Sequence, residues 1–221
     1  MHYKTIFLET LRGKSLVRTL QNIELFNIEV SGDGIDLGAK SKNSSYYRFL
    51  KIKPGTNLIF SDISSTNDGI LKIDLEKTFP LQDLSKDFLI LSNVLEHLFH
   101  YDVCIKECLR VLKKNGRLIG IVPFMYPIHL DPDDHFRYTY STLERLFVDA
   151  GFSHVLIKSI GFGPVTAGFA HIAKIVKLKP LVALLYILSI LTDKLLNVLF
   201  RNNEAVKAEN FPLSYFFICT K

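Results

Sequence analysis

Residues 87–137 constrain the fold of this chain more than any other segment. An apolar run at 88–91 gives way to a polar turn and then to a helix-like stretch. A second apolar run at 118–122 precedes a polar loop that is rich in histidine and aspartate. This order predicts strand, helix and strand, with reactive side chains just past the strand ends. Open α/β sheets bind their ligands at that edge.

The rest of the chain continues the same alternation. Helices are expected at 46–51 and from Ser141, where Ser141 and Glu144 form a capping box and Gly151 suits the helix end. Further short apolar runs predict strands at 34–37, 58–60, 70–73, 154–160 and 213–219. The pattern predicts an α/β fold with a Rossmann-like, doubly wound and mostly parallel sheet.

Composition narrows the class of protein. Hydrophobic residues make up 48% of the 221 residues and charged residues 22%, which is typical of a folded globule. The formal charge of +5 suits an anionic partner such as a nucleotide-linked substrate or a membrane surface. Three cysteines form no disulfide framework, and the first residues lack the pattern of a secretion signal. We therefore expect a cytoplasmic protein.

The expected organisation has four parts. Residues 1–30 form an N-terminal helical segment, 31–161 the core, 162–210 an apolar helical insertion, and 211–221 the final strand of the core. Within the insertion, polar residues recur every four positions at Ser189, Asp193, Asn197 and Arg201.

Three interpretations of the insertion stay open. It is a long helix buried against the domain or against a partner in a homodimer. Alternatively, residues 180–201 contact a membrane peripherally, because Lys174, Lys177 and Lys179 precede an apolar face. A transmembrane span is disfavoured, because the uncharged run 181–191 is shorter than the ~20 residues that a bilayer requires.

Three aspartates end successive predicted strands. Asp36 is followed by Gly38, whose missing side chain lets a ligand approach the backbone closely. Asp62 ends the next strand, where a carboxylate can accept both ribose hydroxyls, and Asp74 ends the third. Each could be an ordinary turn residue, but the three in order predict a nucleoside pocket.

These motifs resemble those of the class I S-adenosylmethionine-dependent methyltransferases over residues 34–152. The segment IDLG resembles the first motif, FSDIS the ribose-binding acidic position, and KIDLEKTFPLQD the adenine-binding segment. NVLEHL, with the helix and LKKNGRLIGIVPF after it, is the most specific match. The tail at 126–152 resembles a subgroup associated with modification of bacterial surface polysaccharides and small molecules.

The resemblance implies a seven-stranded sheet with an antiparallel last strand and S-adenosylmethionine as the cofactor. It assigns cofactor binding to Asp36, Gly38, Asp62, Asp74 and Asn93. One departure is that Lys40 and Lys42 stand where the family has glycines. A lysine there could pair with the cofactor's carboxylate, or it could crowd the site. The alternative function is therefore a catalytically degenerate fold that serves as a membrane-associated or partner-binding subunit.

Methyl transfer to a hydroxyl benefits from a general base, and histidine is the usual choice. We rank His129 first, in the loop after the strand at 118–122, and His97 second. Backbone hydrogen bonding and helix packing are the ordinary alternatives for these two histidines. Tyr126, Asp134 and Arg137 are candidates for substrate binding, although an ion pair between the last two is an equally simple interpretation.

No metal site is expected. His97, His100, Cys104 and Cys108 are spaced along one helical face, but ligands spread over three turns cannot converge on one ion. HLDPDDH offers oxygen ligands for Mg²⁺ or Ca²⁺, yet Asp-Pro-Asp-Asp also makes an ordinary turn. Nucleic acid is disfavoured as a partner, since there is no interleaved arginine and aromatic stripe. We expect O-methylation of a small molecule or a surface-glycan sugar.

Overall fold

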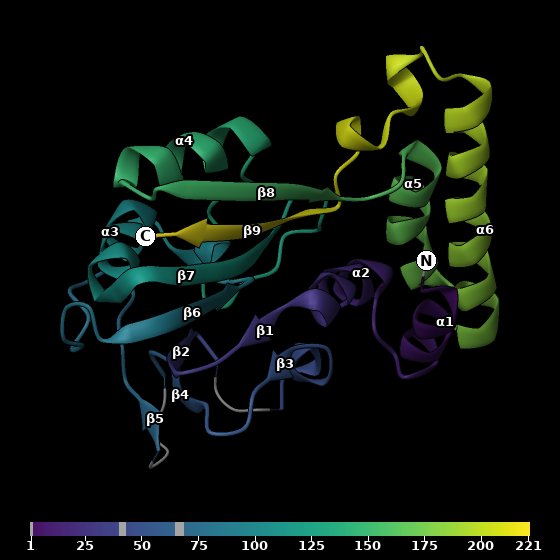
Figure 1. Ribbon diagram of the computed structural model, residues 1–221. Helices are drawn as coiled ribbons and strands as arrows, with labels where there is room; N and C mark the ends of the chain where they lie inside the picture. Colours follow the sequence, from purple (N-terminus) through teal and green to yellow (C-terminus); the bar gives the residue numbers. More distant parts are fainter. Residues whose placement is uncertain (1, 40–42, 65–68) are drawn as a thin grey trace. The chain divides into compact units, whose positions relative to one another are not determined.

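The computed structural model describes residues 2–39, 43–64 and 69–221 (Figure 1). The chain divides into two compact units. The sheet unit comprises Leu25–Pro123, Ile128–Lys158 and Phe216–Lys221, and the helical unit comprises Met1–Glu24, Phe124–Pro127 and Ser159–Tyr215. The N-terminal segment and the apolar insertion, which the sequence presents as separate parts, thus share one unit.

A seven-stranded sheet confirms the predicted fold class. Its order is β5-β4-β2-β6-β7-β9-β8, and the strands from β5 to β7 are parallel. Asn115 donates to the Lys221 carbonyl and Lys221 to that of Gly116, so the last strand, β9, runs antiparallel to β7. The strands are β2 (Asp33–Leu37), β4 (Asn57–Ser61), β5 (Ile70–Leu71), β6 (Lys86–Ser92), β7 (Leu112–Pro123), β8 (His154–Ile160) and β9 (Ser214–Thr220).

Smaller elements complete the chain. A two-stranded parallel sheet pairs β1 (Glu29–Val30) with β3 (Lys51–Ile52). The helix expected at 46–51 is only a 3-10 turn. The 3-10 turns are η1 (Leu25–Asn27), η2 (Ser45–Arg48), η3 (Leu95–His97), η4 (Ala173–Ile175), η5 (Glu204–Val206) and η6 (Ala208–Asn210).

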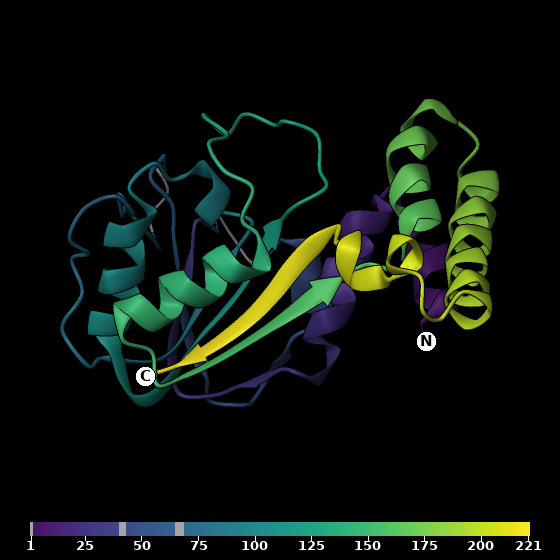
Figure 2. The ribbon, with the colours of Figure 1, turned by 90° about the horizontal axis from the view of Figure 1, so that it is seen from above.

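In the sheet unit, α3 (Tyr101–Val111) and α4 (Tyr140–Ala150) pack side by side against the sheet (Figure 2). The predicted cap of α4 is wrong by two residues. Thr139 is the N-cap, and its hydroxyl accepts from the backbone amide of Thr142 at 3.3 Å. Gly151 ends α4 as predicted, with a left-handed φ of 104°.

Two glycines let aromatic rings lie directly on the sheet. A Cβ at Gly34 would stand 2.1 Å from the ring of Phe88, and a Cβ at Gly120 would stand 2.1 Å from the ring of Phe217. Both rings are almost completely buried. Because glycine has no Cβ, these two aromatic rings can pack directly against the backbone of the sheet.

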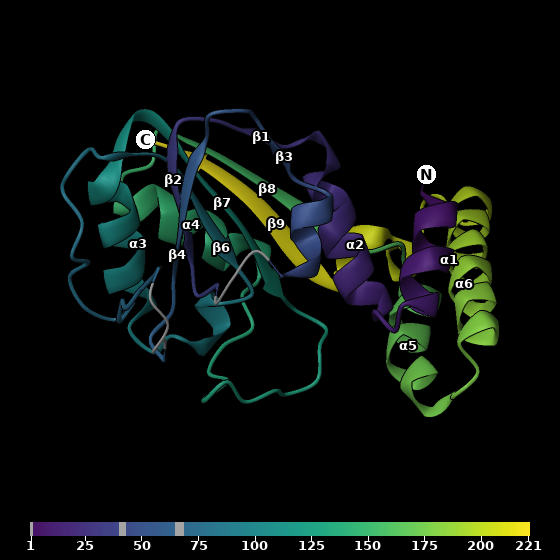
Figure 3. The same cartoon turned by 90° about the horizontal axis from the view of Figure 1, so that it is seen from below.

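The helical unit contains α1 (Tyr3–Leu11), α2 (Leu16–Glu24), α5 (Pro164–Ile172) and α6 (Lys179–Leu199). Helix α6 packs against α1 and α5, as Figure 3 shows. By length and composition it could cross a membrane, and only 33% of its most apolar 18-residue window is buried.

Helix α6 buries polar side chains and exposes an apolar stripe. The polar residues Ser189 and Asp193 are 2% and 0% exposed, so this part of the polar stripe faces into the unit. The outward stripe is apolar and consists of Leu181, Leu184, Leu188, Leu191, Leu195 and Val198, which are 42–76% exposed. Within the unit itself, α6 is therefore only partly covered.

Candidate active site

A cavity of 590 Å³ lies at the carboxyl ends of the parallel strands, within the sheet unit. Its volume is within the range of roughly 300–1,000 Å³ that small-molecule sites occupy. Five residues singled out from the sequence line it together: Gly38, Asp62, Asp74, Asn93 and His97. A second hollow of 680 Å³ lies between α3 and α4, and its lining includes none of the predicted site residues.

The two acidic residues of the cavity follow β4 and β5. Oδ1 of Asp62 accepts hydrogen bonds from the amide and hydroxyl of Ser64, at 2.8 and 2.5 Å. Asp62 Oδ2 has no hydrogen-bond partner among the described residues. Asp74 accepts from the Glu76 amide at 3.1 Å and pairs with the Lys77 ammonium at 2.9 Å, and this lysine lowers the pKa of Asp74. Both carboxylates are thus held in place by their own turns.

The backbone approaches the cavity closely after β2 and β6. Gly38 has a φ of +81°, and a Cβ there would lie 2.7 Å from Cγ2 of Val94. Asn93 has a left-handed φ of 53°, and its amide donates to the carbonyl of Ile121 at 2.8 Å. A side chain at position 38 would therefore fill space beside the cavity, which is how glycine serves a ligand-binding turn.

Asp36 is not among the residues that line the cavity. It is 1% exposed, and its carboxylate accepts hydrogen bonds from the hydroxyls of Tyr46 and Tyr47. Burial raises the pKa of Asp36 to about 7, and the two hydroxyls oppose this shift. Asp36 therefore does not face the cavity. It anchors the segment that follows β2 through its hydrogen bonds with Tyr46 and Tyr47.

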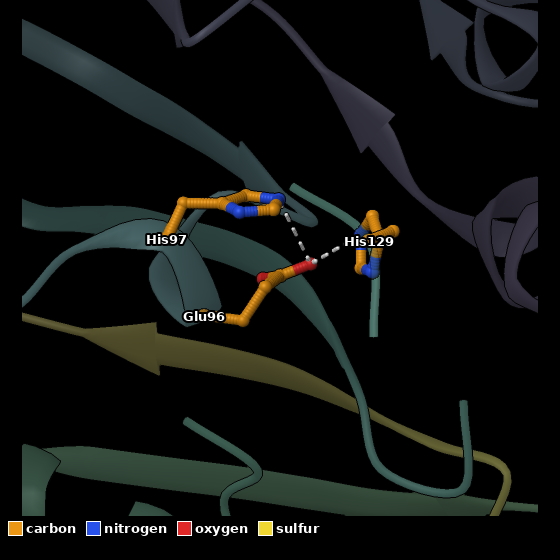
Figure 4. A group of neighbouring side chains, drawn as sticks. All are labelled: Glu96, His97 and His129. Atoms are coloured by element: carbon orange, nitrogen blue, oxygen red, sulfur yellow. Dashed lines mark ion pairs between the residues drawn. The ribbon is translucent and has the colours of Figure 1, made fainter. Parts of the chain in front are cut away.

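His97 and His129 come together beside Glu96, as Figure 4 shows. The two imidazole rings meet edge to face with centroids 5.0 Å apart. Asp134 accepts from the His129 backbone amide at 2.9 Å. Arg137 donates to both oxygens of Asp134 at 2.5 and 2.7 Å and holds the pKa of that carboxyl well below its usual value. Asp134 and Arg137, predicted to bind substrate, are thus paired with each other.

The remaining predicted residues are placed elsewhere. Tyr126 belongs to the helical unit, where its amide donates to the carbonyl of Phe124 at 3.0 Å. Lys40 and Lys42 lie outside the described residues, so the expectation for their loop stays a prediction.

Sequence reasoning missed two parts of the site. Glu96 is fully buried beside the histidines although it directly precedes His97 in the NVLEHL motif. The Glu96–His97 pair between Leu95 and Leu98 was the available signal. The loop 130–133, together with His135, forms one wall of the cavity, which composition alone does not indicate.

Comparison with known proteins agrees with the fold. Residues 32–120 match the family described as a methyltransferase domain. No curated protein matches the chain. Among solved structures, the chain is similar to a SAM-dependent methyltransferase from Archaeoglobus fulgidus, with 17% identity, a TM-score of 0.56, and coverage of 99% of this chain and 100% of that one.

Two other solved structures have the same fold. The [4+2]-cyclase SpnF has 15% identity and a TM-score of 0.56, with 93% of this chain and 80% of that one covered. Phosphoethanolamine N-methyltransferase 2 of Haemonchus contortus, in complex with S-adenosyl-L-methionine, has 12% identity and a TM-score of 0.53, with 91% and 52% covered. At these identities the likeness shows the fold.

The domain match over residues 32–120 and these structures together show a methyltransferase-like fold. The ligand in the Haemonchus contortus structure is S-adenosyl-L-methionine. The cavity fits such a group, because it combines two carboxylates with a glycine turn whose Cβ would meet Val94.

Proposed function

We propose that the chain is an S-adenosylmethionine-dependent methyltransferase that acts on an oxygen of a small molecule or of a surface-glycan sugar. The observation that supports this proposal is the cavity in which Gly38, Asp62, Asp74, Asn93 and His97 meet at the strand ends. S-adenosylmethionine, when bound, supplies an electrophilic methyl group.

The carboxylates of the cavity would hold the adenosine part of the cofactor. Asp62 presents Oδ2 for ribose hydroxyls, while Ser64 fixes its other oxygen. Asp74, anchored by Lys77, would accept from the adenine amino group. Gly38 and Asn93 leave the backbone close to the ligand, and Asp36 supports the segment after β2 through Tyr46 and Tyr47.

The histidines would accept the proton of the methyl-accepting hydroxyl. His97 lines the cavity, whereas His129 is not among the lining residues and its ring meets the ring of His97 edge to face. Asp134 contacts His129 and is itself held by Arg137, so these two residues would orient the base without contacting the substrate. The net charge of +5 favours an anionic acceptor, such as a nucleotide-linked sugar.

Calorimetric titration of the full chain with S-adenosylmethionine tests the proposal. We expect binding that Asp62→Ala and Asp74→Ala each weaken roughly ten-fold or more, because a hydrogen bond to a charged group contributes about 1.5–3 kcal/mol. Asp102→Ala is the matched control, since this exposed aspartate on α3 pairs with Lys106 and does not line the cavity. No binding at millimolar cofactor would refute the proposal.

The second candidate function is a catalytically degenerate fold. Lys40 and Lys42 replace glycines of the first motif, and the similar structure of a cyclase illustrates that one fold serves different chemistries. A Lys40→Gly, Lys42→Gly double variant separates the two functions. A large gain in cofactor affinity would favour the degenerate site, whereas unchanged or weaker affinity would favour the enzyme.

We also propose that α6 rests on the cytoplasmic face of a membrane. Its outward apolar stripe, led by Leu188 and Leu195, would enter the headgroup region. Lys177 and Lys179 are exposed at the start of the helix and suit anionic lipids. A homodimer through the same stripe is the rival arrangement.

A further inference from the structure

Glu96, His97 and His129 form a cluster next to the cavity, within the sheet unit (Figure 4). Oε1 of Glu96 lies 3.8 Å from Nε2 of His97 and 3.9 Å from Nε2 of His129. The ligand atoms of all three side chains lie within 4.8 Å of one another. One carboxylate oxygen and two imidazole nitrogens therefore face a common point.

The chain holds these side chains rigidly. Glu96 and His97 are neighbours on η3, and Glu96 is completely buried while His97 is 12% exposed. The loop that carries His129 is tied to the same turn, because the amides of His135 and Phe136 both donate to the backbone carbonyl of Glu96. The hydroxyl of Tyr138 also donates to the Leu95 carbonyl at 3.1 Å.

Hydrogen bonding assigns a tautomer to His97. Its Nδ1 lies 2.5 Å from the carbonyl oxygen of Asp133, which can only accept, so Nδ1 carries the proton. In the neutral ring Nε2 is then a lone-pair donor directed toward Glu96. A histidine whose second nitrogen is held by a backbone carbonyl in this way is the usual arrangement of a metal ligand.

His129 repeats the arrangement with a carboxylate. Its Nδ1 lies 3.4 Å from Oδ2 of Asp134, which is anionic because it pairs with Arg137. The proton of the neutral ring is thus favoured on Nδ1, and Nε2 again faces Glu96. At zinc sites, a ligand histidine often donates its other ring N–H to a carboxylate, as His129 does here toward Asp134.

We propose that Glu96, His97 and His129 bind a divalent transition-metal ion, with zinc as the type ion. Two histidines and one glutamate are an established ligand set for zinc, with metal–ligand lengths of about 2.0–2.2 Å. The distances of 3.8 and 3.9 Å from Glu96 Oε1 are below twice that length, so one ion can bridge Glu96 and either histidine. Imidazole ligands favour such an ion over Mg²⁺ or Ca²⁺.

The position next to the cavity gives the ion a role. Three protein ligands leave a coordination position for a substrate oxygen, as in catalytic zinc sites. His97 also lines the cavity, so that position belongs to the candidate active site. If the proposed methyl transfer holds, the bound ion would take Nε2 of both histidines, which would then act as ligands in place of bases. The ion would lower the pKa of a bound hydroxyl, whose proton would pass to water. Metal binding itself does not depend on methyl transfer.

The competing arrangement needs no metal. A protonated histidine can pair with Glu96, and the charge of Arg137 also acts on this carboxylate. In that case the cluster is an internal ion-pair network that positions the loop. Metal titration separates the two arrangements.

The test uses the full chain, stripped with a chelator and titrated calorimetrically with Zn²⁺ and, separately, with Mg²⁺. We expect one Zn²⁺ per chain and no Mg²⁺ binding. Glu96→Gln and His129→Asn should weaken Zn²⁺ binding by at least about 100-fold, because each removes a ligand and loss of an outer partner alone costs ~10–100-fold. His154→Asn, an exposed histidine on β8, should bind as the unaltered chain does.

Two further measurements complete the design. Co²⁺ in place of Zn²⁺ should give absorption bands that are lost in His129→Asn, which is informative even if the variant of buried Glu96 does not fold. Cofactor titrations in parallel show whether the methyltransferase proposal fails independently. Absence of stoichiometric Zn²⁺ binding, or binding that His129→Asn leaves unchanged, would overturn the inference.

Discussion

The buried carboxylate of Asp193 on α6 accepts a 2.7 Å hydrogen bond from the backbone amide of Thr166 in the first turn of α5. Its other oxygen accepts from Val165 at 3.0 Å. The first amides of a helix have no partner inside that helix, and a negative charge at this end is favourable. Because Asp193 of α6 caps α5 in this way, the part of the polar stripe that contains Ser189 and Asp193 faces inward, and the leucines of the opposite stripe face outward.

Replacing Asp193 should destabilise the helical unit. Asp193→Ala removes the acceptor of two amides, and we expect a loss of about 3 kcal/mol in the free energy of unfolding. Asp193→Asn keeps one acceptor oxygen and should lose less. Urea denaturation followed by circular dichroism measures both variants. An alanine variant as stable as the unaltered chain would show that this cap contributes nothing.

Gly120→Ala should destabilise the sheet unit through overpacking. Its Cβ would lie 2.1 Å from the Phe217 ring and 2.6 Å from the Leu91 carbonyl oxygen, and backbone there cannot easily move. Such overpacking typically costs about 1–3 kcal/mol. Gly168→Ala is the control, because this position in α5 faces open space and alanine favours helix by up to about 1 kcal/mol. Equal urea midpoints for the two variants would contradict the packing argument.

Local patterns were sufficient to predict the strands of the seven-stranded sheet, but not β1 and β3. Several of them are apolar runs that end at a polar residue, and parallel strands bring those ends to one edge, so Asp62, Asp74 and Asn93 could be placed together. The cap of α4 was misplaced because Ser141 and Glu144 satisfy the capping pattern as well as Thr139 does.

Long-range pairing was beyond sequence reasoning. From the sequence, either stripe of α6 could be the buried one. Which stripe is buried depends on the hydrogen bonds from the amides of α5 to Asp193, and these are long-range contacts. Similarly, Asp36 looked like a ligand for the cofactor because nothing local indicates that Tyr46 and Tyr47 reach its carboxylate. Glu96 acquired significance only once the fold brought His129 to it.

The protonation of Asp36 should make stability depend on pH. Its pKa is raised from 3.8 to about 7 in the folded chain, chiefly by burial, so folding favours the protonated form. This contribution is fully present below pH 3.8 and is lost as the pH rises through about 7.

Asp36→Asn stays neutral and still accepts from the tyrosines, so it isolates the effect. The stability of the unaltered chain relative to this variant should fall between about pH 4 and 7 and then level off. Urea denaturation at several pH values gives the difference directly. Parallel pH profiles for the two proteins would show that the carboxyl is not protonated preferentially in the folded state.

The outward apolar stripe of α6 should make the chain bind to membranes that contain anionic lipid. Full burial of one leucine contributes about 1.5–3 kcal/mol, so a few residues suffice for reversible binding, and Lys177 and Lys179 add electrostatic attraction. We expect the chain to co-sediment with phosphatidylserine vesicles, less so as salt increases. A Leu188→Glu, Leu195→Glu double variant should remain in the supernatant while keeping its stability, because both side chains are about half exposed.

Val148→Glu is the matched control for this change, since Val148 is equally exposed on α4, in the sheet unit. It should bind vesicles as the unaltered chain does. Analytical ultracentrifugation decides between membrane and homodimer. A dimer that the double variant dissociates, together with no vesicle binding, would assign the stripe to a second copy of the chain and refute the membrane proposal.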